Sequence, residues 1–333
     1  MKKETLSSIS ARTGFSITTV SRVLSGNALK YRISPKTAAV VLAEAKRCEY
    51  VPSALAQSLR TKKSKMIGLL LPSVSNPFFA DMASVIIAEL DKFGYMTIVV
   101  DTMESEVRMV DNARALIHRN VDGIIAVPCG DSPVALERIE KDVPVVLVDR
   151  YYPNTRLSYV TTNNFKGSFD ACKLLISKGY KRIVCIQGEL WSTPNKERVS
   201  GYMSAMRESG LEEEAMVVGN EFSSQNGYLE TKLLMSIPSR PEAIFALSNT
   251  IALGALKAVR EVGMRVPKDV ALLSFDDNVY MDYMTPSITR VSQPVDDMAK
   301  LSVKILLDSI KNPDRKKSSQ LALSATILQG ESI

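Results

Sequence analysis

From residue 66 onward the sequence alternates continuous apolar runs of strand length with helical stretches. A strand that is apolar along its whole length is buried on both faces, as in parallel sheets covered by helices on each side. There are too many such runs for one small sheet, so the pattern predicts two α/β lobes, with ligands bound beyond the carboxyl ends of the strands. The clearest runs are MIGLLLPSV (66–74), MTIVVDTM (96–103), VDGIIAVP (121–128), VPVVLVDR (143–150), RIVCIQGE (182–189), AIFALSN (243–249) and VALLSFDD (270–277).

Residues 1–50 lack this alternation and contain three short helical patterns. Thr5, Ser16 and Ser34 precede them as N-caps, and Gly14 ends the first. A helix, a tight turn with glycine, a second helix and a supporting third helix predict a helix-turn-helix unit. The side chains expected to point inward are Leu6, Ile9, Val20, Val23, Leu24, Val41, Leu42 and Ala45.

Charge is distributed unevenly along the 333 residues. Residues 1–65 hold 13 Lys or Arg and 3 acids, a net charge of +10, whereas the remaining 268 residues hold 29 basic and 33 acidic side chains, a net charge of −4. A basic head on a mildly acidic body is expected when only the head meets a polyanion.

Several classes of protein fit the sequence poorly. The amino terminus has no apolar run behind its lysines, and no stretch is long enough to span a membrane, so we expect a cytoplasmic protein without a membrane partner. The cysteines (Cys48, Cys129, Cys172 and Cys185) form no CxxC pair and predict buried thiols rather than a metal site. The single histidine, His118, lies on a predicted exposed helix away from any nucleophile motif, so we expect neither an enzyme nor a cofactor.

Nine segments in order carry a resemblance that covers nearly the whole chain. They are ITTVSRVLSG (17–26), YVPSALAQSLR (50–60), SNPFFADM (75–82), DGIIAVP (122–128), VLVDR (146–150), ERVSGYMSAMRESGL (197–211), LSNTIALGALKAV (247–259), SFDD (274–277) and VSQPVDDMA (291–299). The chain resembles the LacI/GalR family of bacterial transcription regulators.

The resemblance implies a homodimeric repressor with an N-terminal all-α helix-turn-helix domain. It also implies an α/β core of the periplasmic-binding-protein type I fold, made of two doubly wound lobes between which the chain crosses near 163, 291 and 321. The domains expected are a helix-turn-helix domain (1–50), a hinge helix and linker (51–65), an N-terminal lobe (66–163 with 292–321) and a C-terminal lobe (164–291 with 322–333).

The second helix of the head would read double-stranded DNA at a pseudo-palindromic operator. A recognition helix presents its early outward side chains to base edges in the major groove, and here these are Ile17, Thr18, Ser21 and Arg22. Arg22 can bind a guanine with two hydrogen bonds, and Ile17 can pack on a thymine methyl group. The residues suited to contact phosphates are Thr5, Thr19 and Asn27.

One departure from the family pattern lies between the second and third helices of the head. The stretch SGNALKYRIS is longer than the usual family turn and adds Lys30, Tyr31 and Arg32. Two interpretations stay open: the insertion adds a phosphate or base contact, which we assign to Arg32, or it only lengthens a loop.

The hinge segment PSALAQSLR resembles the family's minor-groove helix. By that resemblance Leu59 is the wedge that separates the central base step, with Ala56 against the groove and Arg60 beside it.

Polar side chains follow several of the core strands, and a few aromatic side chains lie beside them. Singly, each is more often a cap or a surface group; Asn249, for example, suits an N-cap. Together they match the sugar-contacting positions of ribose-type binding proteins, and amides, carboxylates and aromatic faces suit a polyhydroxylated ligand. The set is Asn76, Phe78, Phe79, Asp149, Arg150, Arg198 (which opens a helix), Asn249, Asp276 and Gln293.

The charges of this set favour a neutral ligand, because Asp149 and Asp276 balance Arg150 and Arg198. One polar position of a relative falls at Val127, so one hydrogen bond is expected to be absent. Trp191 either lines the pocket or packs under its loop. We therefore expect a repressor whose operator affinity is lowered by a neutral ribose-like or hexose sugar. The alternatives are a sugar acid or nucleoside as ligand, a corepressor mechanism, and a sugar-binding protein without a role in gene regulation.

Overall fold

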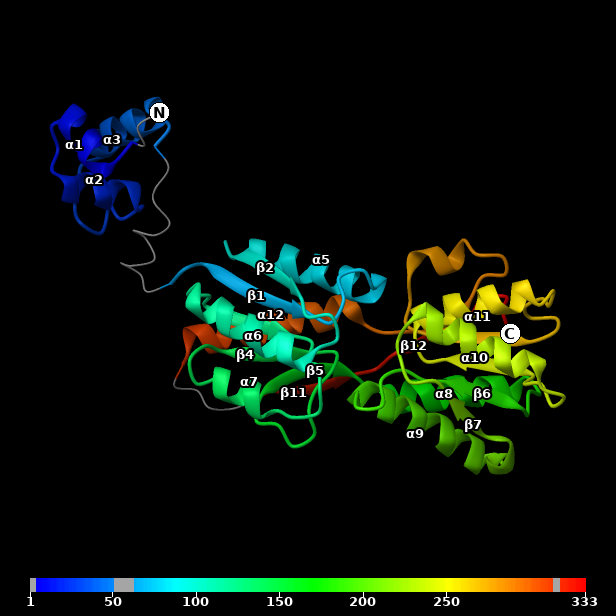
Figure 1. The fold of residues 1–333 in the computed structure, drawn as a ribbon. Helices are drawn as coiled ribbons and strands as arrows, with labels where there is room; N and C mark the ends of the chain where they lie inside the picture. Colours follow the sequence, from blue (N-terminus) through cyan, green and yellow to red (C-terminus); the bar gives the residue numbers. More distant parts are fainter. Residues whose placement is uncertain (1–3, 51–62, 314–317) are drawn as a thin grey trace. The chain divides into compact units, whose positions relative to one another are not determined.

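The computed structural model describes residues 4–50, 63–313 and 318–333. The chain divides into two compact units, Met1–Ser64 and Lys65–Ile333, which we call the head and the core (Figure 1). No helix in the described part of the chain is both long and apolar enough to cross a membrane.

The head contains the three predicted helices, α1 (Leu6–Thr13), α2 (Ile17–Leu24) and α3 (Pro35–Arg47). Each begins where a hydroxyl side chain accepts a backbone N–H: Thr5 from Ser8, Ser16 from Thr19 and Ser34 from Thr37. Gly14 ends α1 with φ 73°, a left-handed conformation that glycine adopts at little cost.

A small apolar cluster holds the three helices together. Its fully buried members are Ile9, Val20 and Val41, with Val23 and Ala45 nearly so. Leu42 was predicted inward, and that prediction is wrong: its side chain is 52% exposed, because it follows Val41 by one residue and so turns about 100° away around the helix.

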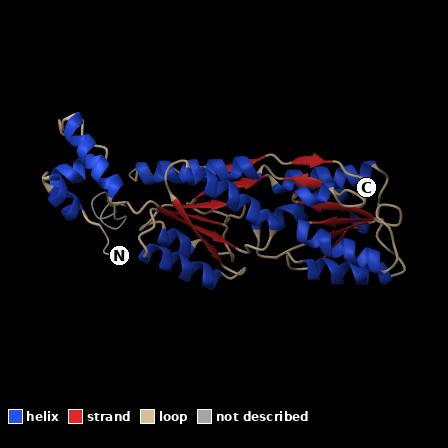
Figure 2. Cartoon of the chain, turned by 90° about the horizontal axis from the view of Figure 1, so that it is seen from above, coloured by secondary structure: helices blue, strands red, loops and turns tan. Residues whose placement is uncertain are grey.

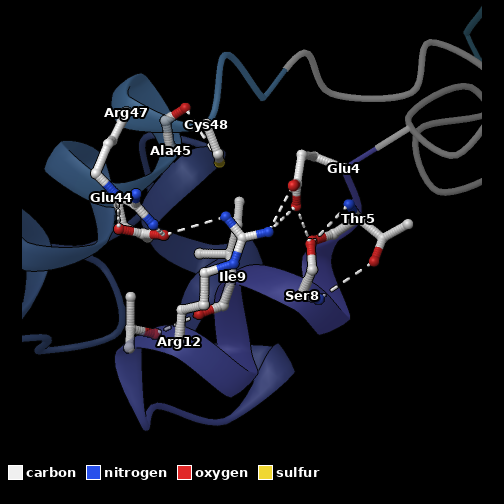
Figure 3. Close-up of polar contacts among 10 residues, drawn as sticks. Glu4, Thr5, Ser8, Ile9, Arg12, Glu44, Ala45, Arg47 and Cys48 are labelled. Carbon is white, nitrogen blue, oxygen red and sulfur yellow. Dashed lines mark hydrogen bonds and ion pairs between the residues drawn. The ribbon is translucent and has the colours of Figure 1, made fainter. Parts of the chain in front are cut away.

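Ion pairs between α1 and α3 add to this packing (Figure 3). Arg12 bridges Glu4 and Glu44, and Glu44 also binds Arg47. The pairs lie at the surface, where such contacts stabilise little. These pairs nevertheless bind the carboxylates of Glu4 and Glu44 to arginines of α1 and α3.

The core contains two six-stranded sheets, one in each lobe. The first lobe has strand order β11-β5-β4-β3-β1-β2 and the second β12-β10-β9-β8-β6-β7. All strand pairs are parallel except β10 with β12. In Figure 2 helices cover both sheets, which confirms the doubly wound, two-lobed fold class.

The first sheet lies between α5 and α12 on one face and α6 and α7 on the other, each face with its own apolar cluster. Its elements are β1 (Met66–Leu71), α5 (Pro77–Asp91), β2 (Met96–Asp101), α6 (Glu106–His118), β3 (Gly123–Ala126), α7 (Val134–Ile139), β4 (Val145–Val148), β5 (Ser158–Thr162), α12 (Val295–Lys311) and β11 (Gln320–Leu323).

The second sheet is covered in the same way by α8 and α9 on one face and α10 and α11 on the other. Its elements are α8 (Asn164–Ser177), β6 (Ile183–Ile186), α9 (Thr193–Glu208), the short 3₁₀ helix η1 (Glu212–Glu214), β7 (Met216–Val218), α10 (Ser224–Ser236), β8 (Ala243–Ala246), α11 (Asn249–Glu261), β9 (Ala271–Phe275), η2 (Val279–Asp282), β10 (Thr289–Ser292) and β12 (Thr326–Leu328).

The chain passes between the lobes three times, at Asn163, at Gln293–Pro294 and at Ser324–Ala325. Because both sheets are built from the same sequence of strand and helix, β4 of the first lobe corresponds to β9 of the second. The loops that follow these two strands supply the main polar groups of the site described next.

Candidate functional site

The two faces of α2 differ as the sequence predicts. Val20 and Val23 are buried in the head, whereas Ile17 is 49% exposed. Thr18 and Arg22 are also exposed, and Ser21 is half-buried. The helix therefore offers one apolar, one cationic and two hydroxyl side chains on or near its outer face.

The residues assigned to phosphate contacts have local hydrogen bonds at helix ends. The Thr5 hydroxyl accepts from the N–H of Ser8, and the Thr19 hydroxyl lies 2.9 Å from that of Ser16. The Asn27 amide donates to the carbonyl of Ser25. Arg32 is exposed in the turn before α3. The three hinge residues Ala56, Leu59 and Arg60 lie outside the described residues.

The core contains a pocket between its two lobes, and seven of the nine predicted ligand residues line it. Asn76 caps α5, whose first turn carries Phe78 and Phe79 with their rings edge to face at 5.2 Å. The residues that line the pocket are Asn76, Phe78, Phe79, Asp149, Arg150, Pro194, Arg198, Phe222, Ser248 and Asp276.

Two aspartates occupy equivalent places in the two lobes. Asp149 follows β4 and Asp276 follows β9, and both have a left-handed backbone, with φ 64° and 70°. Such a conformation is uncommon away from glycine and is often found at functional sites. Both carboxylates are buried. Each lobe thus presents one acid at the carboxyl end of its sheet.

Two buried arginines accompany the aspartates but are held differently. Arg150 binds Glu104 with two hydrogen bonds of 2.6 and 2.9 Å. Its guanidinium lies 5.1 Å from the ring centre of Trp191. Arg198 donates to the Asn164 side chain and lies over the Phe275 ring.

The second lobe adds the contacts of Arg198 and two further acids, Asp276 and Glu189. Arg198 donates to the carbonyl of Leu247 and lies 3.5 Å from the nearer oxygen of Asp276, which also accepts a hydrogen bond of 2.6 Å from Gln293. Glu189 accepts from the backbone N–H of Phe222. Four acids (Glu104, Asp149, Glu189 and Asp276) therefore lie around two arginines.

Burial dominates the titration of these groups. It raises the pKa of Asp149 to about 6 and that of Glu189 to about 7, although Arg150 opposes both shifts. Burial also raises the pKa of Asp276, against the charge of Arg198. For Arg150 burial lowers the pKa, but the hydrogen bonds to Glu104 and the charges of Glu104, Asp149 and Glu189 together more than offset this, and the net shift is upward.

Several buried polar atoms around the pocket have no hydrogen-bond partner within the described residues. They include one oxygen of Asp149, the side-chain nitrogen of Asn249 and the side-chain oxygen of Gln293. The hydroxyl of Tyr280 lies beside the Asn249 side chain and interacts with it, and it has no other hydrogen-bond partner within the described residues. Leaving such groups unpaired is costly, so they are suited to a ligand that both donates and accepts hydrogen bonds.

Comparisons with known proteins agree with this architecture. Residues 172–333 match a family model described as a periplasmic binding protein-like domain. The chain is 31% identical over 331 residues to the ribose operon repressor of Haemophilus influenzae, covering 99% of this chain and 98% of that protein. This chain belongs to the LacI family.

Solved structures show the same fold. The lac repressor dimer bound to operator and the anti-inducer ONPF is 22% identical, with a TM-score of 0.88, and 99% of each chain is covered. A LacI family regulator from Enterococcus faecium with bound ribose is 26% identical, with a TM-score of 0.73, covering 80% of this chain and 98% of that one. As a LacI family member, this chain is a transcriptional regulator rather than an enzyme.

Two details of this LacI family core differ from the sequence analysis. Asn249 is not the N-cap of α11: the Ser248 hydroxyl accepts the N–H of Ile251 instead, and Asn249 is the first helical residue, fully buried. Arg198 does not open its helix, because α9 begins at Thr193, with a proline in its first turn.

Asn249 and Gln293 do not line the pocket directly but lie against residues that do. Asn249 follows Ser248, and Gln293 binds Asp276. Val127 is fully buried in the first lobe. Trp191 packs against the apolar cluster of that lobe and on Arg150. Cys48 is half-buried, unlike the other three cysteines, and His118 is exposed as predicted.

The sequence analysis of this LacI family regulator missed several pocket residues. Phe222 and Ser248 line the cavity, and Glu104 and Glu189 lie beside Arg150. Glu104 follows an edge strand, and Phe222 lies in an ordinary loop, so neither had a motif to mark it. Ser248 could have been found, since it stands directly before the first turn of a predicted helix.

Proposed function

We propose that this chain represses transcription by binding an operator through α2 and the hinge, and that a neutral ribose-like sugar in the core pocket releases it. The observation that carries the ligand assignment is the buried, unpartnered oxygen of Asp149 in the pocket wall, with the unpartnered atoms of Asn249 and Gln293 directly behind that wall. Sugar hydroxyls both donate and accept hydrogen bonds and would satisfy acids and amides together.

The walls of the pocket favour a monosaccharide. Phe78, Phe79 and Phe222 supply aromatic faces for the C–H faces of a sugar ring. The similarity to a ribose operon repressor and to a regulator solved with ribose supports the same choice.

The charge balance disfavours sugar acids and nucleotides. Arg150 already binds Glu104, and Arg198 lies beside Asp276, so neither cation is free to pair with an anionic ligand. A nucleoside remains the second candidate, since it is neutral and also carries a ribose. Corepression is the alternative mechanism and predicts the opposite sign of coupling to DNA.

For the head we propose that Ile17, Thr18, Ser21 and Arg22 contact bases, and that Thr5, Thr19, Asn27 and Arg32 contact phosphates. Ala56, Leu59 and Arg60 would act in the minor groove. The exposed outer face of α2 and the +10 charge of residues 1–65 support this assignment. We keep the predicted domain limits (1–50, 51–65, 66–163 with 292–321, and 164–291 with 322–333) as part of the proposal, with the lobe limits at 291 and 321 moved to the crossings at 293–294 and 324–325.

We also propose a homodimer, which would place two α2 helices on the two halves of one pseudo-palindrome. Exposed apolar side chains on two neighbouring elements of the first lobe support a partner surface. They are Ile87 on α5 and Met96 and Val99 on the edge strand β2. Sedimentation equilibrium of the whole chain tests this, and a monomer at micromolar concentration would contradict it.

Calorimetric titration with a panel of neutral sugars, sugar acids and nucleosides tests the ligand. We expect D-ribose or a close analogue to bind the whole chain, and Asp276→Asn to weaken that binding about 100-fold, because a buried charged partner is lost. Asp111→Asn is the matched control, since Asp111 is 68% exposed on α6. Equal binding by wild type and Asp276→Asn would refute the pocket assignment.

The same panel tests the coupling between sugar binding and operator binding. Operator DNA should change sugar affinity by the factor by which sugar changes operator affinity. A sugar that tightens operator binding would establish corepression instead of induction.

A further inference from the structure

The long turn between α2 and α3 is fixed at both ends to the head. The N–H of Asn27 donates to the carbonyl of Arg22, and the N–H of Ile33 donates to the carbonyl of Ala28. The side chains of Ala28 and Ile33 pack against the apolar cluster of the head. The insertion is therefore a built loop with a defined path, and the side chains between its anchors have set positions.

One of the inserted side chains lies on the proposed base-reading arginine. The guanidinium carbon of Arg22 is 4.0 Å from the ring centre of Tyr31, a distance at which an arginine stacks on an aromatic face. Stacking covers the flat face of the guanidinium, while its N–H groups point outward in the plane of the group. In such a stack the edge that binds guanine with two hydrogen bonds would stay available.

Among the described residues, no ion pair joins Arg22 to a carboxylate. Glu4 and Glu44 bind Arg12 and Arg47 instead (Figure 3). Arg22 and Tyr31 are both exposed, Tyr31 by 45%. The aromatic ring is thus the partner that orients an otherwise long and flexible side chain.

We propose that Tyr31 is a positioning residue for base recognition, which holds the Arg22 guanidinium in the plane needed to read one base pair of each half-site. The inference rests on the proposed DNA function. It gives the insertion a role distinct from that of its neighbours, since Lys30 and Arg32 are cations suited to phosphates, whereas Tyr31 carries no charge and acts through Arg22.

The test begins with the whole wild-type chain and a pool of random DNA duplexes, from which the preferred operator is selected. Fluorescence anisotropy then measures the affinity for this operator, for each single-base variant of it and for unrelated DNA, at several salt concentrations. The variants are Tyr31→Leu, which removes the aromatic face, Tyr31→Phe, which keeps it, and Lys30→Ala, which removes a neighbouring charge from the same loop.

Tyr31→Leu should weaken the selected operator about 2- to 5-fold per half-site and flatten the preference at one base position, with affinity for unrelated DNA and the salt slope unchanged. Tyr31→Phe should discriminate between the operator and its single-base variants as well as the wild type does. Lys30→Ala should instead weaken all sequences alike and reduce the salt slope by about 1 per contact.

A double-mutant cycle links the effect to Arg22. Adding Tyr31→Leu to Arg22→Ala should cause no further loss of discrimination. Thermal unfolding by circular dichroism checks the head, and Tyr31→Gln, which keeps bulk without an aromatic face, replaces Tyr31→Leu if that variant unfolds. Unchanged discrimination in these variants, or additive effects in the cycle, would overturn the role of Tyr31. If the wild type selects no sequence, the proposed DNA function itself fails.

Discussion

Arg22 in the head and Arg150 in the core both lie against aromatic side chains, yet their electrostatic surroundings are opposite. Arg22 is exposed, and its contact is the Tyr31 ring, without an ion pair to the described acids. Arg150 is 3% exposed and holds Glu104 with two hydrogen bonds. An exposed cation without an acid is available to a polyanion, whereas a buried and neutralised one supports a neutral ligand.

The contrast shows that residue type alone does not tell what an arginine binds. Both side chains offer the same planar set of donors. The acid that does or does not share the site decides whether the charge is available to a partner. Three experiments test this difference between the two arginines.

The largest effects should come from removing each arginine. Arg150→Ala removes the cation that binds the half-buried Glu104 and leaves the buried Asp149 with Arg198 as its remaining cation, so the core should lose about 3 kcal/mol of unfolding free energy. Arg22→Ala should leave stability within about 0.5 kcal/mol but weaken operator binding about 10- to 100-fold per half-site. Urea unfolding and operator titration measure the two outcomes.

Arg114→Ala serves as the control for both, because Arg114 is 65% exposed on α6. If Arg22→Ala destabilised the chain as much as Arg150→Ala, or if Arg150→Ala left stability unchanged, the two arginines would not differ in the way described.

A smaller effect is expected from making the core arginine resemble that of the head. Glu104→Gln removes the charge that neutralises Arg150, so the pocket should gain about tenfold in affinity for an anionic ligand such as ribose 5-phosphate. Affinity for the neutral sugar should change by less than about 3-fold. Calorimetry compares the two ligands, with Glu208→Gln on the exposed side of α9 as the control; no gain for the anion would argue against charge selection by Glu104.

A further difference concerns pH. Burial raises the pKa of Glu189 to about 7 from an ordinary value of 4.5, with Glu104 adding to the shift and Arg150 and the N–H of Phe222 opposing it. Because the folded state favours the protonated acid, its contribution to stability is complete below pH 4.5 and is lost as the pH rises through 7. Wild type should therefore lose thermal stability relative to Glu189→Gln between pH 5 and 8, and parallel melting curves would contradict this.

Much of the fold could be predicted because burial leaves a direct mark on sequence. The seven apolar runs became β1, β2, β3, β4, β6, β8 and β9, although β2 is an edge strand with Met96 and Val99 exposed, so the prediction that this run is buried is wrong. Strands such as β11 and β12 at the sheet edges have alternating exposure and only three or four residues, so they carry little periodic signal. The antiparallel pairing of β12 has no sequence signature at all.

The site could be predicted only where strand ends and the family resemblance mark it. Asp149 and Asp276 each end a strand, so topology brings them to one crevice. Glu104 reaches Arg150 across 46 positions of sequence, and nothing local records that approach. The stack of Tyr31 on Arg22 likewise depends on the path of the inserted loop, which spacing alone does not determine.

The matching left-handed aspartates after β4 and β9 have a consequence for how the protein distinguishes signals. Each lobe carries one such aspartate, one arginine and its own share of the aromatic and amide groups, so neither lobe alone specifies the molecule that fits between them. Under the proposed function, a compound that satisfies one lobe but not the other would not hold the two lobes together, so a partial mimic of the ligand would bind without changing operator affinity.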